Sequence, residues 1–403
     1  TPDSASVRET AHGNPNCGPS LRPAAQLLAS AATSGALPAG TSAAAGDPTT
    51  LNTSDLLVLY STGAKNNWGS AVEMENRIAA VVATANTYLE QSQIANLRWH
   101  LVGTAEAPAY TTTEKLEDDL DRLANPLTEL GRFAAERRTF YGADQVMFIV
   151  DGTRDYAGIA HLGTPTNPAA FSVVHHPGTA ATAAHELAHN FGCRHDRQTE
   201  GAADGDGKYN YGHRFTRNSQ DIGTIMSYAD YFVPYFSNPS VNYDGIPVGI
   251  AAGQPKAADN ARWLRENAAG VSSLRASKTA VAPAITGQPA AVTVTAGQTL
   301  SLSVTATGND LTYQWSHDGT EIAGATAATY RKYNCTGSDA GSYTVLVSNL
   351  LGQVRSNAAT VTVNPAPVTP PPTTNNSNSG GGGGGGAIEL VAALGLLALL
   401  GTA

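Results

Sequence analysis

The sequence has few cysteines and few positive charges. Its 403 residues include three cysteines, Cys17, Cys193 and Cys335, which are too few for a disulfide framework and odd in number, so at least one has no partner within the chain. Only 24 lysines and arginines oppose 33 acidic residues, which gives a net charge of -9. This balance, without any basic run, argues against nucleic acid and against anionic membrane surfaces as partners.

Long hydrophobic runs are also missing. The apolar run Leu390–Leu400 is shorter than the about 20 residues that a transmembrane helix needs. By contrast, 41 glycines and 22 prolines indicate much loop and linker, so we expect two or three domains rather than one core. The first residues lack a charged start followed by an apolar run, which fits a chain numbered from after a cleaved leader.

The most informative stretch is residues 185–196, which reads HELAHNFGCRHD. On a helix, His185 and His189 lie one turn apart, so both imidazoles leave the same face and can bind one ion. Gly192 can adopt the positive φ that ends the helix and returns His195 to the same ion. Three neutral imidazoles with a fourth position left for water are typical of catalytic zinc. The sequence therefore predicts zinc bound by His185, His189 and His195.

Glu186 flanks these histidines but lies too far around the helix to be a ligand. Zinc lowers the pKa of bound water toward about 7, and Glu186 is placed to accept the proton of that water and pass it to a leaving amine. A chance match to His-Glu-x-x-His becomes remote once Gly192 and His195 are also required. We therefore expect a hydrolase in which Glu186 is the general base and then the general acid.

The pattern His-Glu-x-x-His-x-x-Gly-x-x-His resembles that of the metzincin zinc endopeptidases, and every position of it is met. Thr224–Tyr228 resembles the Met-turn of that family, which implies that Met226 forms an apolar floor beneath the imidazoles. Asp196 directly after the third histidine, and Phe236–Pro239 downstream, resemble the adamalysin (reprolysin) branch and its bacterial secreted relatives. Tyr228 instead resembles the tyrosine of astacins and serralysins, which can bind zinc and then hydrogen-bond the oxyanion.

This mixed signature leaves two roles open for Tyr228, a catalytic one and that of a buried tyrosine whose hydroxyl is satisfied locally. Asp196 is expected to be an acceptor that orients His195 or the backbone of the Met-turn. No ligand spacing to the triad is found for three further histidines, His161, His175 and His176. We expect none of these three to bind the metal.

An α+β fold is expected, with a metzincin-like domain before an all-β module. Three strands are predicted at Leu56–Tyr60, Leu97–Val102 and Val146–Val150. Residues 70–90 carry apolar residues at helical spacing, residues 113–141 predict a helix broken near Pro126, and residues 256–275 predict a last amphipathic helix. This order agrees with a metzincin, in which a twisted mixed sheet accompanies the zinc helix.

Two segments bear on the substrate. In the adamalysin-like pattern, Tyr156–Leu162 is the exposed edge strand and Phe171–His176 is the next, buried strand. An open edge has unpaired N–H and C=O groups to which an extended peptide can add, so the resemblance implies polypeptide substrates. Tyr231–Tyr235 is expected to line the pocket for the residue after the cut bond. Asp204–Gly207 lacks the ligand run of a calcium loop and is expected to be a solvated turn.

From about Pro283 to Asn364, short alternating runs separated by turn signals predict a β-sandwich. Trp315 and Tyr343 resemble the core tryptophan and the tyrosine corner of immunoglobulin-like domains. Val304 and Val345 stand where that family has its two disulfide cysteines, so the core is expected to depend on apolar packing, with Cys335 on a loop. Such a module can bind carbohydrate or protein, or act as a spacer.

Composition divides the chain into five expected segments: a leader or pro-segment remnant (1–51), a catalytic domain (52–277), an immunoglobulin-like domain (278–364), a linker (365–386) and a hydrophobic C-terminal sorting tail (387–403). Asn14–Ser20 resembles the cysteine switch of metzincin zymogens but lacks its flanking basic and acidic residues, so a bridge from Cys17 to Cys193 and two idle thiols stay open. The glycines 380–386 and the apolar tail resemble bacterial glycine-type sorting tails without their closing arginines, and the alternative is a poorly ordered end.

The sequence thus predicts a monomeric zinc metalloendopeptidase, secreted or sorted to a bacterial surface, that touches the membrane only transiently through its tail. One alternative is a surface adhesion protein that binds through the immunoglobulin-like module, with a degenerate zincin scaffold. Intact ligands and an intact Glu186 weigh against it. A second alternative is a zinc amidase or other hydrolase, which would cut no extended peptide.

Overall fold

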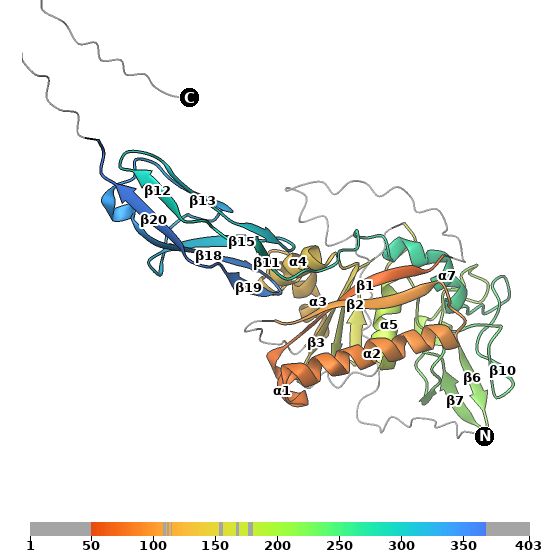
Figure 1. Cartoon of the computed structure of the whole chain (residues 1–403). Helices are drawn as coiled ribbons and strands as arrows, with labels where there is room; N and C mark the ends of the chain where they lie inside the picture. Colours follow the sequence, from red (N-terminus) through yellow and green to blue (C-terminus); the bar gives the residue numbers. More distant parts are fainter. Residues whose placement is uncertain are drawn as a thin grey trace, which may run out of the picture.

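The computed structural model describes residues 50–367, apart from residues 108–109, 111–112, 114, 153–155, 167–168 and 176–179. The predicted leader with its cysteine switch, most of the linker and the sorting tail lie outside the described residues. The described part forms two units that lie end to end (Figure 1). Within the described ranges, no helix is both long enough and apolar enough to cross a membrane.

The first unit contains a five-stranded sheet in the order β2-β1-β3-β5-β4. Its strands are β1 (Asn52–Tyr60), β2 (Leu97–Glu106), β3 (Gln145–Val150), β4 (Gly158–Ala160) and β5 (Phe171–His175). All neighbouring pairs are parallel except β4 with β5, so the predicted mixed sheet is confirmed. The order also confirms that the strand at residues 158–160 lies at the edge, next to the strand that begins at Phe171.

Side chains of β1 alternate between two apolar cores, because successive residues of a strand point to opposite faces. Leu56 and Val58 pack in a core with α2 (Ala71–Gln91), α5 (Ala180–Asn190) and α7 (Asn260–Val271). Leu57 and Leu59 pack in the other core with α3 (Leu116–Ala124) and α4 (Glu129–Tyr141). The unit is therefore a three-layer structure, with helices covering both faces of the sheet (Figure 1).

The predicted helix at residues 70–90 is confirmed as α2, which begins with a capping box between Ser70 and Glu73. The predicted break near Pro126 separates α3 from α4. Strand β2 continues to Glu106, four residues beyond the predicted end, where it stays paired with β1. The last helix is shorter than predicted, because Asp259 caps its first turn and turns precede it.

The sequence patterns did not predict two short helices, α1 (Thr62–Trp68) and α6 (Arg197–Glu200), which have only seven and four residues. Between α6 and α7 lie short strands, β6 (Arg214–Arg217), β7 (Gln220–Gly223), β8 (Tyr231–Phe232), β9 (Asn242–Tyr243) and β10 (Ile246–Pro247). Residues 204–207 form exposed turns, as expected. Asp206 accepts hydrogen bonds from Arg197 and Tyr211 there.

The second unit is an all-β sandwich of strands β11 (Ala284–Gly287), β12 (Val292–Thr295), β13 (Leu300–Ser303), β14 (Thr305–Thr307), β15 (Thr312–His317), β16 (Thr320–Glu321), β17 (Thr329–Lys332), β18 (Gly341–Asn349), β19 (Gly352–Arg355) and β20 (Ala359–Asn364). Trp315 is fully buried opposite Val345, and the hydroxyl of Tyr343 donates to the carbonyl of Asp339 at 2.9 Å. These contacts confirm the predicted core tryptophan and tyrosine corner.

The core of the sandwich is apolar, as the valines at the cysteine positions predict. Val304 and Val345 are both buried in it. Cys335 lies on a loop, also as predicted, and its thiol is free and packed into the same core.

Candidate functional site

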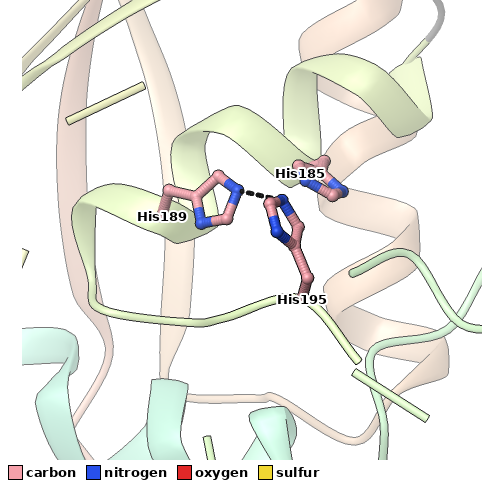
Figure 2. A group of neighbouring side chains, drawn as sticks. All are labelled: His185, His189 and His195. Carbon is pink, nitrogen blue, oxygen red and sulfur yellow. Dashed lines mark hydrogen bonds between the residues drawn. The ribbon is translucent and has the colours of Figure 1, made fainter. Parts of the chain in front are cut away.

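Three histidines converge at the C-terminal end of α5. His185 and His189 are one turn apart on this helix, and His195 returns to them from the loop that follows (Figure 2). One nitrogen from each ring lies within 4.8 Å of the others, and all three residues are buried. Among the described residues, this is the group of histidine, cysteine and acidic side chains that can hold a metal ion.

The rings of His185 and His189 are anchored through their outer nitrogens. Nδ1 of His185 lies 2.7 Å from the carbonyl of Ile225, and Nδ1 of His189 lies 2.7 Å from the carbonyl of Cys193. Because a carbonyl only accepts, each Nδ1 carries the proton and each Nε2 keeps its lone pair. Burial lowers the pKa of His185 to about 3 and that of His189 well below its ordinary value, so both rings are neutral. Neutral imidazoles are the form that binds metal.

The loop that returns His195 depends on Gly192. Its φ is +96°, the left-handed conformation that the sequence predicted at this position. Backbone pairing of Arg194 with Asn210 and Gly212 holds the loop in place. As a result, Nε2 of His195 lies 3.2 Å from Nε2 of His189 (Figure 2). The donor set, one nitrogen from each of three buried imidazoles, fits zinc.

A residue that the sequence patterns did not single out completes the anchoring. Glu200, at the end of α6, places Oε1 3.2 Å from Nδ1 of His195 and Oε2 2.7 Å from Nη1 of Arg194. Burial would raise the pKa of Glu200, but the hydrogen bonds and charges of His195 and Arg194 lower it below its ordinary value. The only signal in the sequence was an acidic residue five positions after a ligand histidine.

The Met-turn, residues 224–228, lies against this group. Met226 is completely buried, and the carbonyl of Ile225 is the acceptor for His185. The hydroxyl of Tyr228 lies 3.0 Å from Nε2 of His195, with the two ring centroids 4.7 Å apart. Asp196 accepts from the backbone N–H of Tyr228 at 3.1 Å, which confirms its predicted contact with the Met-turn backbone.

Glu186 is fully buried on α5 and faces the edge strand. Its carboxylate is so close to Gly158 of β4 that a Cβ atom there would lie 2.6 Å from Oε1 and 2.7 Å from Cγ of Glu186. The structure therefore places a carboxylate from the helix that carries His185 and His189 against the strand that forms the edge of the sheet.

Two further histidines of the described residues and the nearby cysteine lie outside this group. His161 is buried beside Phe171, and His175 on β5 contacts the carbonyl of Gly152. His176 is outside the described residues. Cys193 is completely buried with a free thiol, and burial raises the pKa of that thiol. The backbone carbonyl of Cys193, rather than its sulfur, contacts the metal centre, because it accepts from Nδ1 of His189.

Comparisons with known proteins agree with this geometry. Residues 50–238 match the family described as metallo-peptidase family M12, and residues 282–349 match the immunoglobulin domain. Peptidyl-Asp metalloendopeptidases of Stenotrophomonas maltophilia (strain R551-3) and Xanthomonas campestris pv. campestris are 27% identical over 242 residues and 28% identical over 249 residues. Each match covers 58% of this chain and 54% of the relative, so the chain spans about half the length of these curated relatives.

A further match covers a shorter part of the chain. The decoration protein of Escherichia phage T5 is 46% identical over 80 residues, which cover 19% of this chain and 48% of that protein. Together with the motif, the sheet order and the sandwich core, these matches show that residues 50–238 are similar to metallopeptidase family M12, as a metzincin-like domain would be, and that residues 282–349 are similar to the immunoglobulin domain.

Proposed function

We propose that the chain is a zinc-dependent endopeptidase that cuts extended polypeptides. The observation that carries this proposal is the position of Glu186, a buried carboxylate on the helix that carries His185 and His189, packed close to Gly158 of the edge strand β4. In this proposal His185, His189 and His195 hold the metal. The family match and the relatives support the same activity.

Zinc, when bound, would supply a Lewis acid that lowers the pKa of water to about 7. The carboxylate of Glu186 would accept a proton from the attacking water and return it to the nitrogen of the leaving amine. The carbonyls of Ile225 and Cys193 fix the ring orientations of His185 and His189. The other nitrogen of each ring, Nε2, therefore keeps a lone pair that can bind the metal. Tyr228 places a hydroxyl beside the same centre, where it can donate to the oxygen on which negative charge develops.

The edge strand explains how a polypeptide would be held. Strand β4 is last in the sheet order and pairs with β5 on one side only among the described residues. An extended peptide can add to its open side as a further strand. Because Gly158 of β4 touches Glu186, a peptide bound along this edge passes within reach of the carboxylate.

The proposal includes a bacterial extracellular location, either secreted or at the cell surface, and a monomeric state. It is supported by the resemblance of the C-terminal residues to sorting tails and by the bacterial relatives. Nucleic acid is not among the proposed partners, because the net charge is -9.

Metal analysis combined with casein digestion tests the proposal. We expect one zinc per chain in the purified protein and fragments of casein whose termini mass spectrometry can assign. The residues next to the cleaved bonds also show whether this chain cuts at aspartate, as the name of the relatives indicates for them. A protein without a stoichiometric transition metal, or one that leaves casein and all extended peptides intact, would contradict the proposal.

Gly158→Ala is expected to reduce kcat/KM for casein peptides about tenfold. The new methyl group would overlap the Glu186 carboxylate, so Glu186 must leave its preferred rotamer, which costs about 1.4 kcal/mol. Steady-state kinetics with a fluorogenic casein-derived peptide measure the loss. Gly270→Ala is the matched control, because no atom lies within 4 Å of a Cβ there. Equal activity of the two variants would refute a tight fit between β4 and Glu186.

A second candidate function is binding through the immunoglobulin-like domain. It is supported by the match of residues 282–349 to the immunoglobulin domain and by the 46% identity of 80 residues of the chain to a phage decoration protein. In that case the first unit would be a scaffold. Zinc binding without any cleavage of casein would favour this adhesion function over the endopeptidase.

A further inference from the structure

We propose that Glu200 is a positioning residue of the metal centre, whose carboxylate fixes the orientation and the protonated nitrogen of His195. This inference rests on the proposed function, because it assigns a role toward the zinc that the three histidines would hold. Glu200 is outside the motif of residues 185–196 and comes from a different element, α6.

The three histidines are anchored in different ways. The acceptors for His185 and His189 are backbone carbonyls, of Ile225 and Cys193. For His195 the partner at Nδ1 is a side chain, the carboxylate of Glu200 at 3.2 Å. A substitution can therefore remove the anchor of His195 without altering the backbone, which makes this anchor testable.

The position of Glu200 is itself well determined. Helix α6 begins at the cap residue Asp196, which accepts from the backbone N–H and the hydroxyl of Thr199, and it ends at Gly201 in the left-handed conformation. Arg194 binds the second carboxylate oxygen at 2.7 Å. With only 12% of its side chain exposed and both oxygens engaged, Glu200 is held in one orientation.

This arrangement has two consequences for metal binding. The carboxylate, 3.2 Å from Nδ1 of His195, favours the proton on that nitrogen, so the lone pair is on Nε2, which lies 3.2 Å from Nε2 of His189. It also adds one negative charge to the surroundings of a divalent ion, in a buried position where screening is weak. Removing such a partner of a ligand histidine typically weakens metal binding 10- to 100-fold.

Zinc affinity of the full chain measures the effect. In competition with a chromogenic chelator at pH 7.5, we expect Glu200→Gln to weaken zinc binding about tenfold and Glu200→Ala about a hundredfold. The glutamine keeps the shape and one acceptor but loses the charge. Cobalt absorption provides a readout that a general loss of stability would not change: the ligand-field bands of the cobalt-substituted Glu200→Ala protein should shift from those of the wild type.

Glu90→Gln is the control, because Glu90 is also paired with an arginine, Arg98, but lies on the exposed surface of α2. Its zinc affinity and cobalt spectrum should equal those of the wild type. Wild-type affinity and spectrum in both Glu200 variants would overturn the role of Glu200 alone. A wild-type chain that binds no zinc would overturn the proposed function, and the role of Glu200 with it.

Discussion

Replacing Glu186 with glutamine is expected to lower kcat/KM for a casein-derived peptide about 10³-fold while zinc stays bound. An amide has nearly the shape of the carboxylate, so it fits the buried space between α5 and Gly158. It cannot accept a proton from water, however. General acid–base groups contribute typically about 10²- to 10⁴-fold to a rate, and a 10³-fold loss corresponds to about 4 kcal/mol of transition-state stabilisation.

The location of Glu186 makes the substitution specific. The side chain lies on the helix that carries His185 and His189, and the anchors of those two rings are the backbone carbonyls of Ile225 and Cys193. None of these contacts involves Glu186, so the histidine geometry should survive. The loss is therefore expected in kcat, with KM nearly unchanged.

Zinc content and steady-state kinetics of the purified Glu186→Gln protein measure the two parts of this prediction. Glu266→Gln serves as the control, since Glu266 lies on α7 and is paired with Arg262 and Tyr209. A Glu186→Gln protein that holds zinc and cuts peptides at the wild-type rate would exclude Glu186 as the base.

Much of the site could be anticipated because its histidines lie close together in the sequence. Helical periodicity places His185 and His189 on one face, and a positive φ at Gly192 directs the chain back within a few residues. These positions are only a few residues apart, so their spacing in the sequence is enough to predict how the side chains come together. The strands and longer helices were predictable for a similar reason, since their apolar periodicity extends over several turns or pleats.

The rest of the site depends on contacts that the sequence pattern does not encode. Glu200 reaches His195 only because a four-residue helix intervenes, and so short a helix has no periodic signal. Gly158 meets Glu186 across 28 positions, through the pairing of β4 with β5 and the packing of α5 on both. Tertiary contacts of this kind depend on the order of the strands in the sheet. The residues alone did not predict that order, which came only from the resemblance to a known family.

The role of Tyr228 can be decided by removing a single atom. Tyr228→Phe is expected to lower kcat about 10²-fold with KM nearly unchanged, because losing one donor to a developing oxyanion costs about 10²- to 10³-fold. The hydroxyl lies 3.0 Å from Nε2 of His195, the nitrogen proposed to hold the metal. The phenylalanine ring keeps the packing against His195 and the near-parallel stacking with His185, whose centroid is 6.1 Å away.

Kinetics on the fluorogenic peptide, with zinc content measured on the same preparation, separate the two roles left open for this tyrosine. Tyr243→Phe is the control, since Tyr243 lies on β9 against Phe215 and Arg217. If the hydroxyl were only satisfied locally, Tyr228→Phe would match the control in kcat. A catalytic hydroxyl instead gives a selective loss of kcat at full zinc occupancy, because the backbone N–H of Tyr228 still donates to Asp196 and the Met-turn keeps its place.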